Sequence, residues 1–509
     1  MSSQPESLAT KGLRAIKWNY LGAIIRVLAQ LVAQITMARI LGPEIVGSFG
    51  YALLLIGVLS LLIDQGLGWA IVHAPAVTDD EFRIVLTRVM LAAMLCATAT
   101  FIWADPIASL LGSSSAADAI RFISPAYMFI GLIVVTHAKL RKELRFREIQ
   151  ISQTLSYVIA YPIVGISLAV VGAGIWSLVV AWMLQAALVT VLMLRYAPHS
   201  FAFASPFRKL SFGSYSRDIA SINLINWTVD HTANAFIGRV FGPAALGLYN
   251  TTLGLVRVPA SHLVVNIQTV LFPSAALVKD NLPSLRKLYR TSLAAVLLIA
   301  IPAFSFVAVA SEAIIAVVLG PKWSAAASML PPVALAMIPH VISSITGSTL
   351  SGCGEQKIEL ASQAMIVVLL IAAYFILPLN SAVTVCWLFL GLYLIRAGFL
   401  FKAALRRLQL DWRAAVPIIR GPLIVTLLGS ALYSLLAAEG SFSPYLLVAA
   451  GAVIFALIEL LLLAVSPQVF MDRSVFDLLA RVRTKYALLD WFLKKVDDKI
   501  APANPDNPD

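Results

Sequence analysis

The chain has 509 residues, of which 60% are hydrophobic and 13% carry a charged side chain. Soluble domains carry roughly twice that share of charge, so the composition excludes an ordinary soluble protein and predicts an all-α protein that crosses a membrane many times. Its net charge of +12 requires no nucleic-acid partner, because Lys and Arg concentrate in the cytoplasmic loops of membrane proteins.

Apolar segments long enough to cross a hydrocarbon core of about 30 Å recur along the whole chain. We expect about fourteen transmembrane helices, at 15–38, 45–72, 84–104, 119–138, 150–172, 174–195, 213–238, 246–270, 291–311, 326–350, 360–379, 381–401, 414–437 and 444–466. The first is too long for the hydrophobic region of a signal peptide, so we expect it to be retained as a helix.

The positive charges predict the orientation of these helices. If the N-terminus is cytoplasmic, thirty Lys and Arg residues lie on the inner side, four lie outside and four lie within spans. The four outer cations are Arg39, Arg121, Arg239 and Lys322. This asymmetry predicts a multi-pass protein with both termini in the cytoplasm.

An internal repeat organises the chain. The string RILGP at 39–43 recurs as RVFGP at 239–243, and a second set of matches relates residues 136–153 to 346–363 at an offset of 210. Six spans separate equivalent points, and an even number preserves membrane orientation, so we expect two parallel repeats. The predicted organisation is a six-helix bundle at 1–205, a second at 206–410, an added helix pair at 411–467 and a cytoplasmic amphipathic tail at 468–509.

The first helix of each repeat carries polar residues four positions apart, which places them on one helical face. In the first repeat these are Arg26, Gln30 and Gln34; two hundred residues later they are Asn226, Asp230 and Asn234. A charge at the bilayer centre costs roughly 2.5–3.5 kcal/mol, so lipid does not contact these faces. They predict either a hydrated cavity between the bundles or hydrogen bonds between helices within each bundle.

Other ionisable residues within the spans are candidates for binding or coupling. Arg26 and Arg257 are suited to hold an anionic group, because guanidinium is permanently charged and matches phosphate geometry; the alternative is pairing with a carboxylate such as Asp64. We expect Arg217 and Arg396 to extend toward the inner surface. The candidates for coupling to ion movement are Asp64, Asp230, His262 and Glu459.

The sequence contains no signature of an enzyme or a metal site. The motifs GxxxxGK[ST], HExxH and GxSxG are missing, and the three cysteines, Cys96, Cys353 and Cys386, are isolated from one another. We therefore expect no catalytic residues, no disulfide, no metal and no cofactor.

Several stretches, taken in order and spacing, resemble polysaccharide flippases of the Wzx type. These are ARILGPEIVGSFG at 38–50, LLIDQGLGWAIVH at 61–73, ALGLYNTTLGLVRVP at 245–259, FPSAAL at 272–277, LGPKW at 319–323 and SGCGEQ at 351–356. Such proteins belong to the multidrug/oligosaccharidyl-lipid/polysaccharide exporter superfamily. The resemblance covers nearly all of 10–410 and implies the two-bundle fold of that superfamily.

The resemblance also implies a function. It implies a bacterial inner-membrane protein that moves undecaprenyl-pyrophosphate-linked oligosaccharides from the cytoplasmic to the periplasmic leaflet by alternating access, for O-antigen, capsule or exopolysaccharide synthesis. The family uses cationic cavity residues in the first helices of both halves, a placement that Arg26 and Arg257 match by helix. The implied partners are the lipid-linked oligosaccharide and membrane lipids, with a polysaccharide polymerase and a chain-length regulator as further candidates.

Two alternatives stay open from the sequence. One is a small-molecule or drug antiporter of the same superfamily, against which fourteen spans and cavity arginines argue. The other is a membrane polymerase or ligase of surface glycans, which would need a large loop or a carboxylate cluster at one interface.

Overall fold

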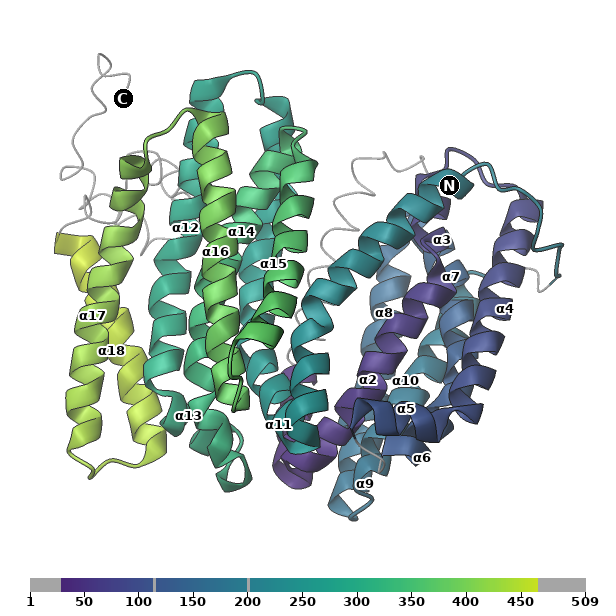
Figure 1. Ribbon diagram of the computed structural model, residues 1–509, viewed down its shortest axis with the longest axis horizontal. Coiled ribbons are helices and arrows are strands. Elements are labelled where there is room, and N and C mark those ends of the chain that lie inside the picture. Colours follow the sequence, from purple (N-terminus) through teal and green to yellow (C-terminus); the bar gives the residue numbers. More distant parts are fainter. Residues whose placement is uncertain (1–28, 113–115, 199–201, 466–509) are drawn as a thin grey trace, which may run out of the picture. The chain divides into compact units, whose positions relative to one another are not determined.

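The computed structural model describes residues 29–112, 116–198 and 202–465 (Figure 1). Within these ranges every regular element is a helix, which confirms the prediction of an all-α polytopic fold. The chain forms two compact units, residues 1–250 and 251–509, and each is described by itself. The division predicted at 205/206 stays a prediction.

The first unit packs around the α4–α7 pair, with α3 and α10 against α7. Its core includes Leu67 and Ile71 of α3 and Tyr127 at the start of α7, all nearly inaccessible to solvent. Its elements are Ala29–Leu41, α2 (Pro43–Asp64), α3 (Leu67–His73), α4 (Asp79–Ile102), α5 (Ala104–Leu111), α6 (Ala117–Ile123), η2 (Ser124–Ala126), α7 (Tyr127–Lys142), α8 (Phe146–Val158), η3 (Ile159–Gly165), α9 (Ile166–Val170), α10 (Ile175–Tyr196) and the first part of α11 (Gly213–Leu277).

In the second unit α14 packs between α12 and α16, and α17 packs against α12 and α18. The added pair predicted at 411–467 therefore consists of α17 and α18, which pack against each other. After the end of α11 the elements are α12 (Leu282–Val309), α13 (Ser311–Val318), η4 (Pro321–Ser328), α14 (Leu330–Gly352), α15 (Gln356–Ile376), α16 (Ala382–Leu408), η5 (Trp412–Ala415), α17 (Val416–Ala438) and α18 (Pro444–Val465).

Twelve helices in the described part are long and apolar enough to cross a membrane. One of them, α11, is interrupted by non-helical backbone at Gly242 and so contains both spans predicted at 213–238 and 246–270. The short helix Ala29–Leu41 is the described end of the first predicted span. The helix content thus agrees with about fourteen spans, while the amphipathic tail predicted at 468–509 lies outside the described residues.

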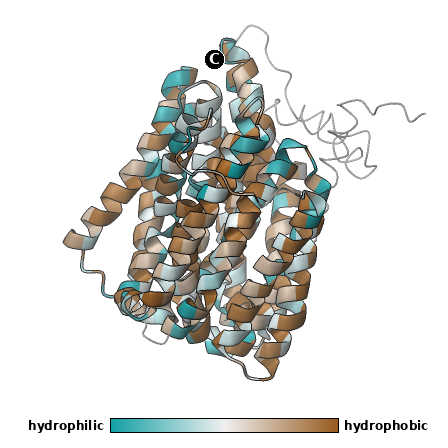
Figure 2. Cartoon of the chain, turned by 90° about the vertical axis from the view of Figure 1, so that its right-hand side faces the viewer, coloured by the Kyte–Doolittle hydropathy of each residue, from teal (hydrophilic) through white to brown (hydrophobic). Residues whose placement is uncertain are grey.

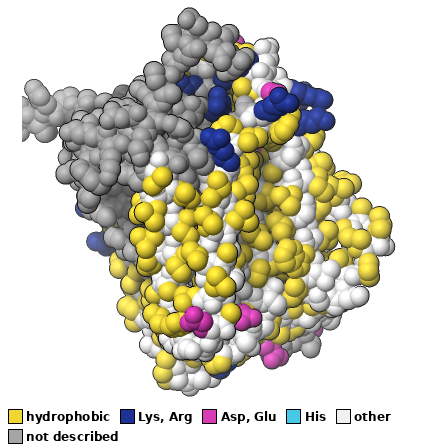
Figure 3. All heavy atoms as spheres, turned by 90° about the vertical axis from the view of Figure 1, so that its left-hand side faces the viewer, with side chains coloured by type: hydrophobic (Ala, Val, Ile, Leu, Met, Phe, Trp, Pro, Cys, Tyr) yellow, Lys and Arg dark blue, Asp and Glu magenta, His cyan; other side chains and the backbone are white. Residues whose placement is uncertain are grey.

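The surfaces of the helices carry the pattern expected of membrane spans. Apolar residues dominate the lengths of the helices, and hydrophilic residues gather at their ends (Figure 2). On the flank of the second unit where α17 and α18 lie, hydrophobic side chains cover the middle, Lys and Arg gather at one end, and Asp and Glu mark the other (Figure 3). Such a separation of charge is typical of helices that obey the positive-inside rule.

The two Gly-Pro strings interrupt helices in the same way. Gly42 has φ 80° and ψ 172°, and Gly242 has φ 83° and ψ −177°, a conformation that strongly favours glycine. The proline that follows has no N–H to donate, so it fits the first turn of the next helix. The helix boundary predicted at each repeat is confirmed.

The repeated strings also pack against each other within the first unit. A Cβ atom on Gly47 would lie 1.7 Å from the carbonyl oxygen of Pro243, and one on Gly247 would lie 1.9 Å from that of Pro43. Nearby, the Tyr51 hydroxyl donates a buried 2.7 Å hydrogen bond to the Gly238 carbonyl. The contact is reciprocal, so the sequence repeat forms a local two-fold pairing of α2 with α11.

We expect Gly47→Ala, and separately Gly247→Ala, to lower the free energy of unfolding by about 1–3 kcal/mol, because each methyl group would collide with rigid backbone. The measurement is thermal unfolding of the purified protein in detergent, followed by tryptophan fluorescence. Gly391→Ala and Gly398→Ala on α16 are matched controls, since a Cβ there meets nothing within 4 Å. Equal stability of all four variants would contradict the pairing.

Candidate functional site

The structure describes most, but not all, of the two predicted polar faces. Arg26 lies outside the described residues. Gln30 and Gln34 lie half-buried on the helix Ala29–Leu41. The second face lies on α11 in the same unit, so both faces belong to residues 1–250.

The polar face of α11 changes in exposure along its length. Asn226 and Asp230 are exposed, whereas Asn234 is half-buried and donates through Nδ2 to Oδ1 of Asn250, at 2.6 Å. The hydrogen-bonding reading applies at Asn234, and a hydrated cavity at the other two positions stays a prediction. Asn234 joins two parts of α11 across the kink, and the two earlier residues present polar groups to accessible space.

Helical geometry accounts for this gradient. Each residue advances about 100° around the helix, so a spacing of four drifts by about 40° per step. Trp227 faces α2, where a Cβ on Gly57 would lie 2.5 Å from its indole Nε1. Asn234 lies about 20° from Trp227 and Asn226 about 100° from it, which turns Asn234 toward the packed side and Asn226 away.

Arg257 lies half-buried on the second part of α11, within the second unit. His262 follows five residues later, about 140° around the helix, and is exposed. Arg257 and His262 therefore lie on different faces of α11. Their spacing argues against both side chains binding the same substrate group.

The other coupling candidates occupy separate places. Asp64 is the last residue of α2, and its Oδ1 accepts a 3.0 Å hydrogen bond from the backbone N–H of Gly68 in the first turn of α3. This contact favours a capping role for the carboxylate. Glu459 lies half-buried on α18, outside the duplicated segments. Their coupling roles stay predictions.

A buried ion pair in the second unit was missed by the sequence reasoning. Arg396 on α16 is only 8% exposed, and its Nη2 lies 2.5 Å from Oε1 of Glu359 on α15, while its Nε donates to the Ser362 hydroxyl at 3.3 Å. The expectation that Arg396 extends to the surface is wrong, because the neighbouring helix supplies a carboxylate. The only available signal was Glu359 itself, which lies one residue before the predicted span.

A glycine on a third helix makes room for this pair. A Cβ on Gly347 of α14 would lie 2.2 Å from Oε2 of Glu359. That oxygen is buried and accepts no hydrogen bond among the described residues. The pair therefore joins α14, α15 and α16 at one point, and the structure supports a stabilising role for it.

The described residues contain no group of three or more His, Cys, Asp or Glu side chains placed to hold a metal ion. The polar side chains of the described spans are amide, carboxylate and guanidinium groups together with many Ser and Thr hydroxyls. Such groups can replace the hydration of a polar headgroup through hydrogen bonds and ion pairing.

Comparison with known proteins places this arrangement in context. The profile of a family described as "Polysaccharide biosynthesis protein" matches residues 36–328. The lipopolysaccharide biosynthesis protein WzxC of Escherichia coli (strain K12) is 26% identical over 351 residues, which cover 67% of this chain and 69% of that protein. The succinoglycan biosynthesis transport protein ExoT of Rhizobium meliloti (strain 1021) is 28% identical over 334 residues, 63% of this chain and 65% of that protein.

Among solved structures, the lipid II flippase MurJ in an inward closed conformation has a similar fold. The TM-score is 0.71 at 13% sequence identity, and the match covers 87% of this chain and 98% of that one. At this identity the likeness shows the fold alone.

We expect Arg396→Gln to lower the free energy of unfolding by about 3–5 kcal/mol, because it leaves the Glu359 carboxylate buried without its partner. The double variant Arg396→Gln with Glu359→Gln is expected to recover part of the loss, as a double-mutant cycle by thermal unfolding would measure. Arg208→Gln is the control: its pair with Asp80 is mostly exposed, so the loss is at most about 1 kcal/mol. An additive cycle would contradict the ion pair.

Proposed function

Because the chain belongs to the polysaccharide biosynthesis protein family, we propose that it is a flippase for undecaprenyl-pyrophosphate-linked oligosaccharides. It moves these units from the cytoplasmic to the periplasmic leaflet, where they supply the synthesis of a surface polysaccharide. The names of its relatives, one for lipopolysaccharide biosynthesis and one for succinoglycan transport, support this assignment. The fold that it shares with a lipid II flippase supports it further.

One structural observation carries the proposal at the level of residues. Asn226 and Asp230 are exposed although they lie well inside a helix that crosses the membrane. Contact of the Asn226 amide with lipid would leave its hydrogen-bonding capacity unmet. The exposed part of the α11 face therefore lines an aqueous path, and Gln30 and Gln34 of the first repeat contribute to it.

The physical task is to carry a charged, hydrated headgroup through hydrocarbon. Removing a pyrophosphate from water without compensation costs far more than any transport cycle supplies. The guanidinium groups of Arg26 and Arg257 would hold the pyrophosphate, and the amide side chains would hydrogen-bond the sugars. The prenyl chain stays in lipid, and the two repeats expose the site to each leaflet in turn.

The membrane potential can supply direction without ATP. Moving negative charge toward the positive outer side gains roughly 2.3 kcal/mol per charge for each 100 mV. This gain in free energy is lost if the protein carries a cation inward when it returns to the state that faces the cytoplasm. Asp230 is the coupling candidate that the exposure pattern favours most, ahead of Asp64, His262 and Glu459.

We place the protein in the bacterial inner membrane with both termini in the cytoplasm, as the distribution of Lys and Arg predicts. A polysaccharide polymerase and a chain-length regulator are its candidate partners, since they would consume the translocated units. A drug antiporter is not favoured, because the relatives are named for polysaccharide biosynthesis and transport.

Replacing Arg26 and Arg257 together by Gln is expected to slow translocation at least about tenfold, because the headgroup loses both of its fixed counter-charges. The measurement is transfer of undecaprenyl-pyrophosphate-linked oligosaccharide between leaflets of proteoliposomes, read by accessibility to an added glycosidase. An imposed inside-negative potential should accelerate transfer by the wild-type protein.

The matched control is Arg39→Gln with Arg239→Gln, which removes two exposed arginines from the repeated turns. This variant should retain most of the translocation activity. Undiminished transfer by the Arg26 and Arg257 double variant would refute the assigned site.

The purified protein is expected to leave the length of lipid-linked repeats unchanged, because leaflet transfer makes and breaks no glycosidic bond. Incubation with the lipid-linked units, followed by mass spectrometry of the glycans, measures this. Chains longer than the input would instead support a polymerase.

A further inference from the structure

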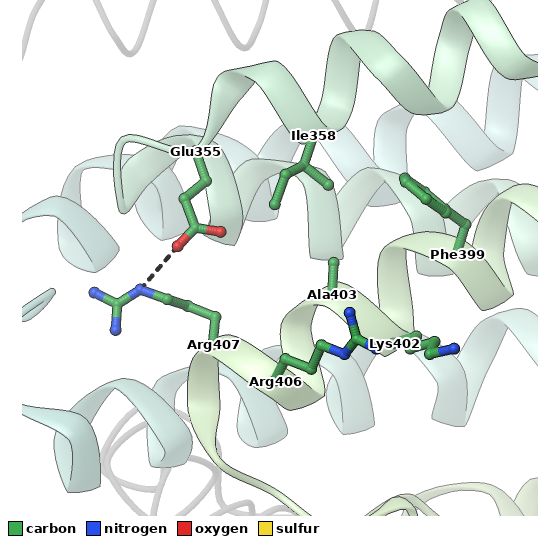
Figure 4. A pocket seen from close by; sticks show the side chains of 7 residues that line it. All are labelled: Glu355, Ile358, Phe399, Lys402, Ala403, Arg406 and Arg407. Atoms are coloured by element: carbon green, nitrogen blue, oxygen red, sulfur yellow. Dashed lines mark ion pairs between the residues drawn. The ribbon is translucent and has the colours of Figure 1, made fainter.

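A pocket with a basic rim lies between α15 and α16, at the end where α16 finishes and α15 begins. Its volume is about 530 Å³. Ile358 on α15 and Phe399 and Ala403 on α16 form its apolar part, and cationic side chains of α16 lie along one side (Figure 4). It belongs wholly to the second unit, and none of its residues takes part in the proposed transport path.

Two of the pocket's three cations have no partner among the described residues. Arg407 is neutralised, since its Nε lies 3.1 Å from Oε1 of Glu355 and its Nη2 donates to the Lys279 carbonyl at 3.1 Å. Lys402 and Arg406 are exposed, and neither forms an ion pair with a carboxylate among the described residues. They stand four residues apart on one helix face, where like charges repel each other. An anion bound beside both would relieve that repulsion.

The equivalent place in the first unit is built differently. At the offset of 210, Lys402 and Arg406 correspond to Leu192 and Tyr196 of α10. The cation there, Arg145, is fully engaged: it pairs with Glu148 at 3.1 Å and Glu143 at 3.4 Å and donates to the Tyr196 carbonyl at 2.8 Å. The first repeat thus engages Arg145 internally and has Leu192 and Tyr196 at the two positions where the second repeat presents cations beside an apolar surface.

The orientation of the helices in the membrane does not explain why Lys402 and Arg406 lie on the helix flank, because cations anywhere in the cytoplasmic loops would set that orientation equally well. The positions of Lys402 and Arg406 on the helix flank, directly beyond the apolar residues, match an amphiphile instead. Phe399 is 40% exposed, and Ile395, one turn further along α16, is 51% exposed. A small hydrated anion would use the cations and leave this apolar flank uncovered.

We propose that the pocket binds the phosphate headgroup of an anionic phospholipid in the leaflet at this end, which is the predicted cytoplasmic one. The phosphate lies between Lys402 and Arg406, and an acyl chain packs along Phe399 and Ile395. Basic pockets between transmembrane helices on the cytoplasmic side recognise lipid headgroups in this way. The lipid is a resident partner of the second unit and is distinct from the transported molecule.

The experiment titrates phosphatidylglycerol onto the full-length protein in detergent and measures the dissociation constant by native mass spectrometry. Lys402→Gln with Arg406→Gln should weaken binding by about 30-fold, since each cation near a membrane surface contributes roughly a factor of five. The control, Lys357→Gln with Arg413→Gln, removes two exposed cations near the same end and outside the pocket. It should change binding less than about threefold.

A second variant separates lost charge from lost folding. Exchanging the two side chains, Lys402→Arg with Arg406→Lys, keeps both charges and should bind phosphatidylglycerol within about threefold of wild type. Equal losses in the pocket variant and the control variant would overturn the proposal, and so would loss of binding in the exchanged variant.

Other ligands identify the source of the phosphate. Phosphatidylethanolamine, which has no net charge, should bind far more weakly than phosphatidylglycerol, and equal binding would overturn the proposal. Inorganic phosphate that binds as tightly as the lipid would also overturn it, because the acyl chain would then contribute nothing. If the pocket variant binds undecaprenyl pyrophosphate more weakly than wild type but binds phosphatidylglycerol equally well, the pocket binds the transported lipid, and the proposal fails.

Discussion

The packing of α2 against the start of the second repeat depends on two glycines that have no room for a side chain. Gly47 lies against the Pro243 carbonyl and Gly247 against the Pro43 carbonyl, so the repeated helix starts meet backbone to backbone. In a membrane, where helices gain little from the hydrophobic effect when they associate, such close approach is a main source of packing energy. The contact sets the register of α2 and α11, and through it the direction in which the α11 polar face points.

That register explains why equivalent polar positions do not have equivalent environments. Trp227 packs against Gly57 of α2. This packing orients α11 so that Asn234 hydrogen-bonds Asn250 across the kink, while Asn226 and Asp230 stay exposed. The polar residues on one face of α11 are thus hydrogen-bonded within the protein at Asn234 and accessible at Asn226 and Asp230. Under the proposed function this division is useful, because one part of the helix would stay anchored while Asn226 and Asp230 contact the substrate.

The two repeats share backbone design and differ in where charge is placed. The first unit satisfies Arg145 with its own carboxylates, whereas the second buries Arg396 against Glu359 and leaves Lys402 and Arg406 exposed beside a pocket. Equivalent positions of the two repeats carry different residues, so the two similar scaffolds present charge in different places. Under the proposed function, the exposed α11 face serves substrate passage and the pocket beside α16 serves lipid recognition.

The sequence alone determined the all-helical class, the approximate number of spans and the repeat, because length, hydropathy and periodicity are properties of local segments. It also indicated which helices carry polar faces. The tertiary structure decided what polar residues contact at a distance in the chain: Asn234 bonds Asn250, and Arg396 pairs with Glu359. Those outcomes depend on which helices become neighbours and at what rotation, and no spacing within one helix contains that information.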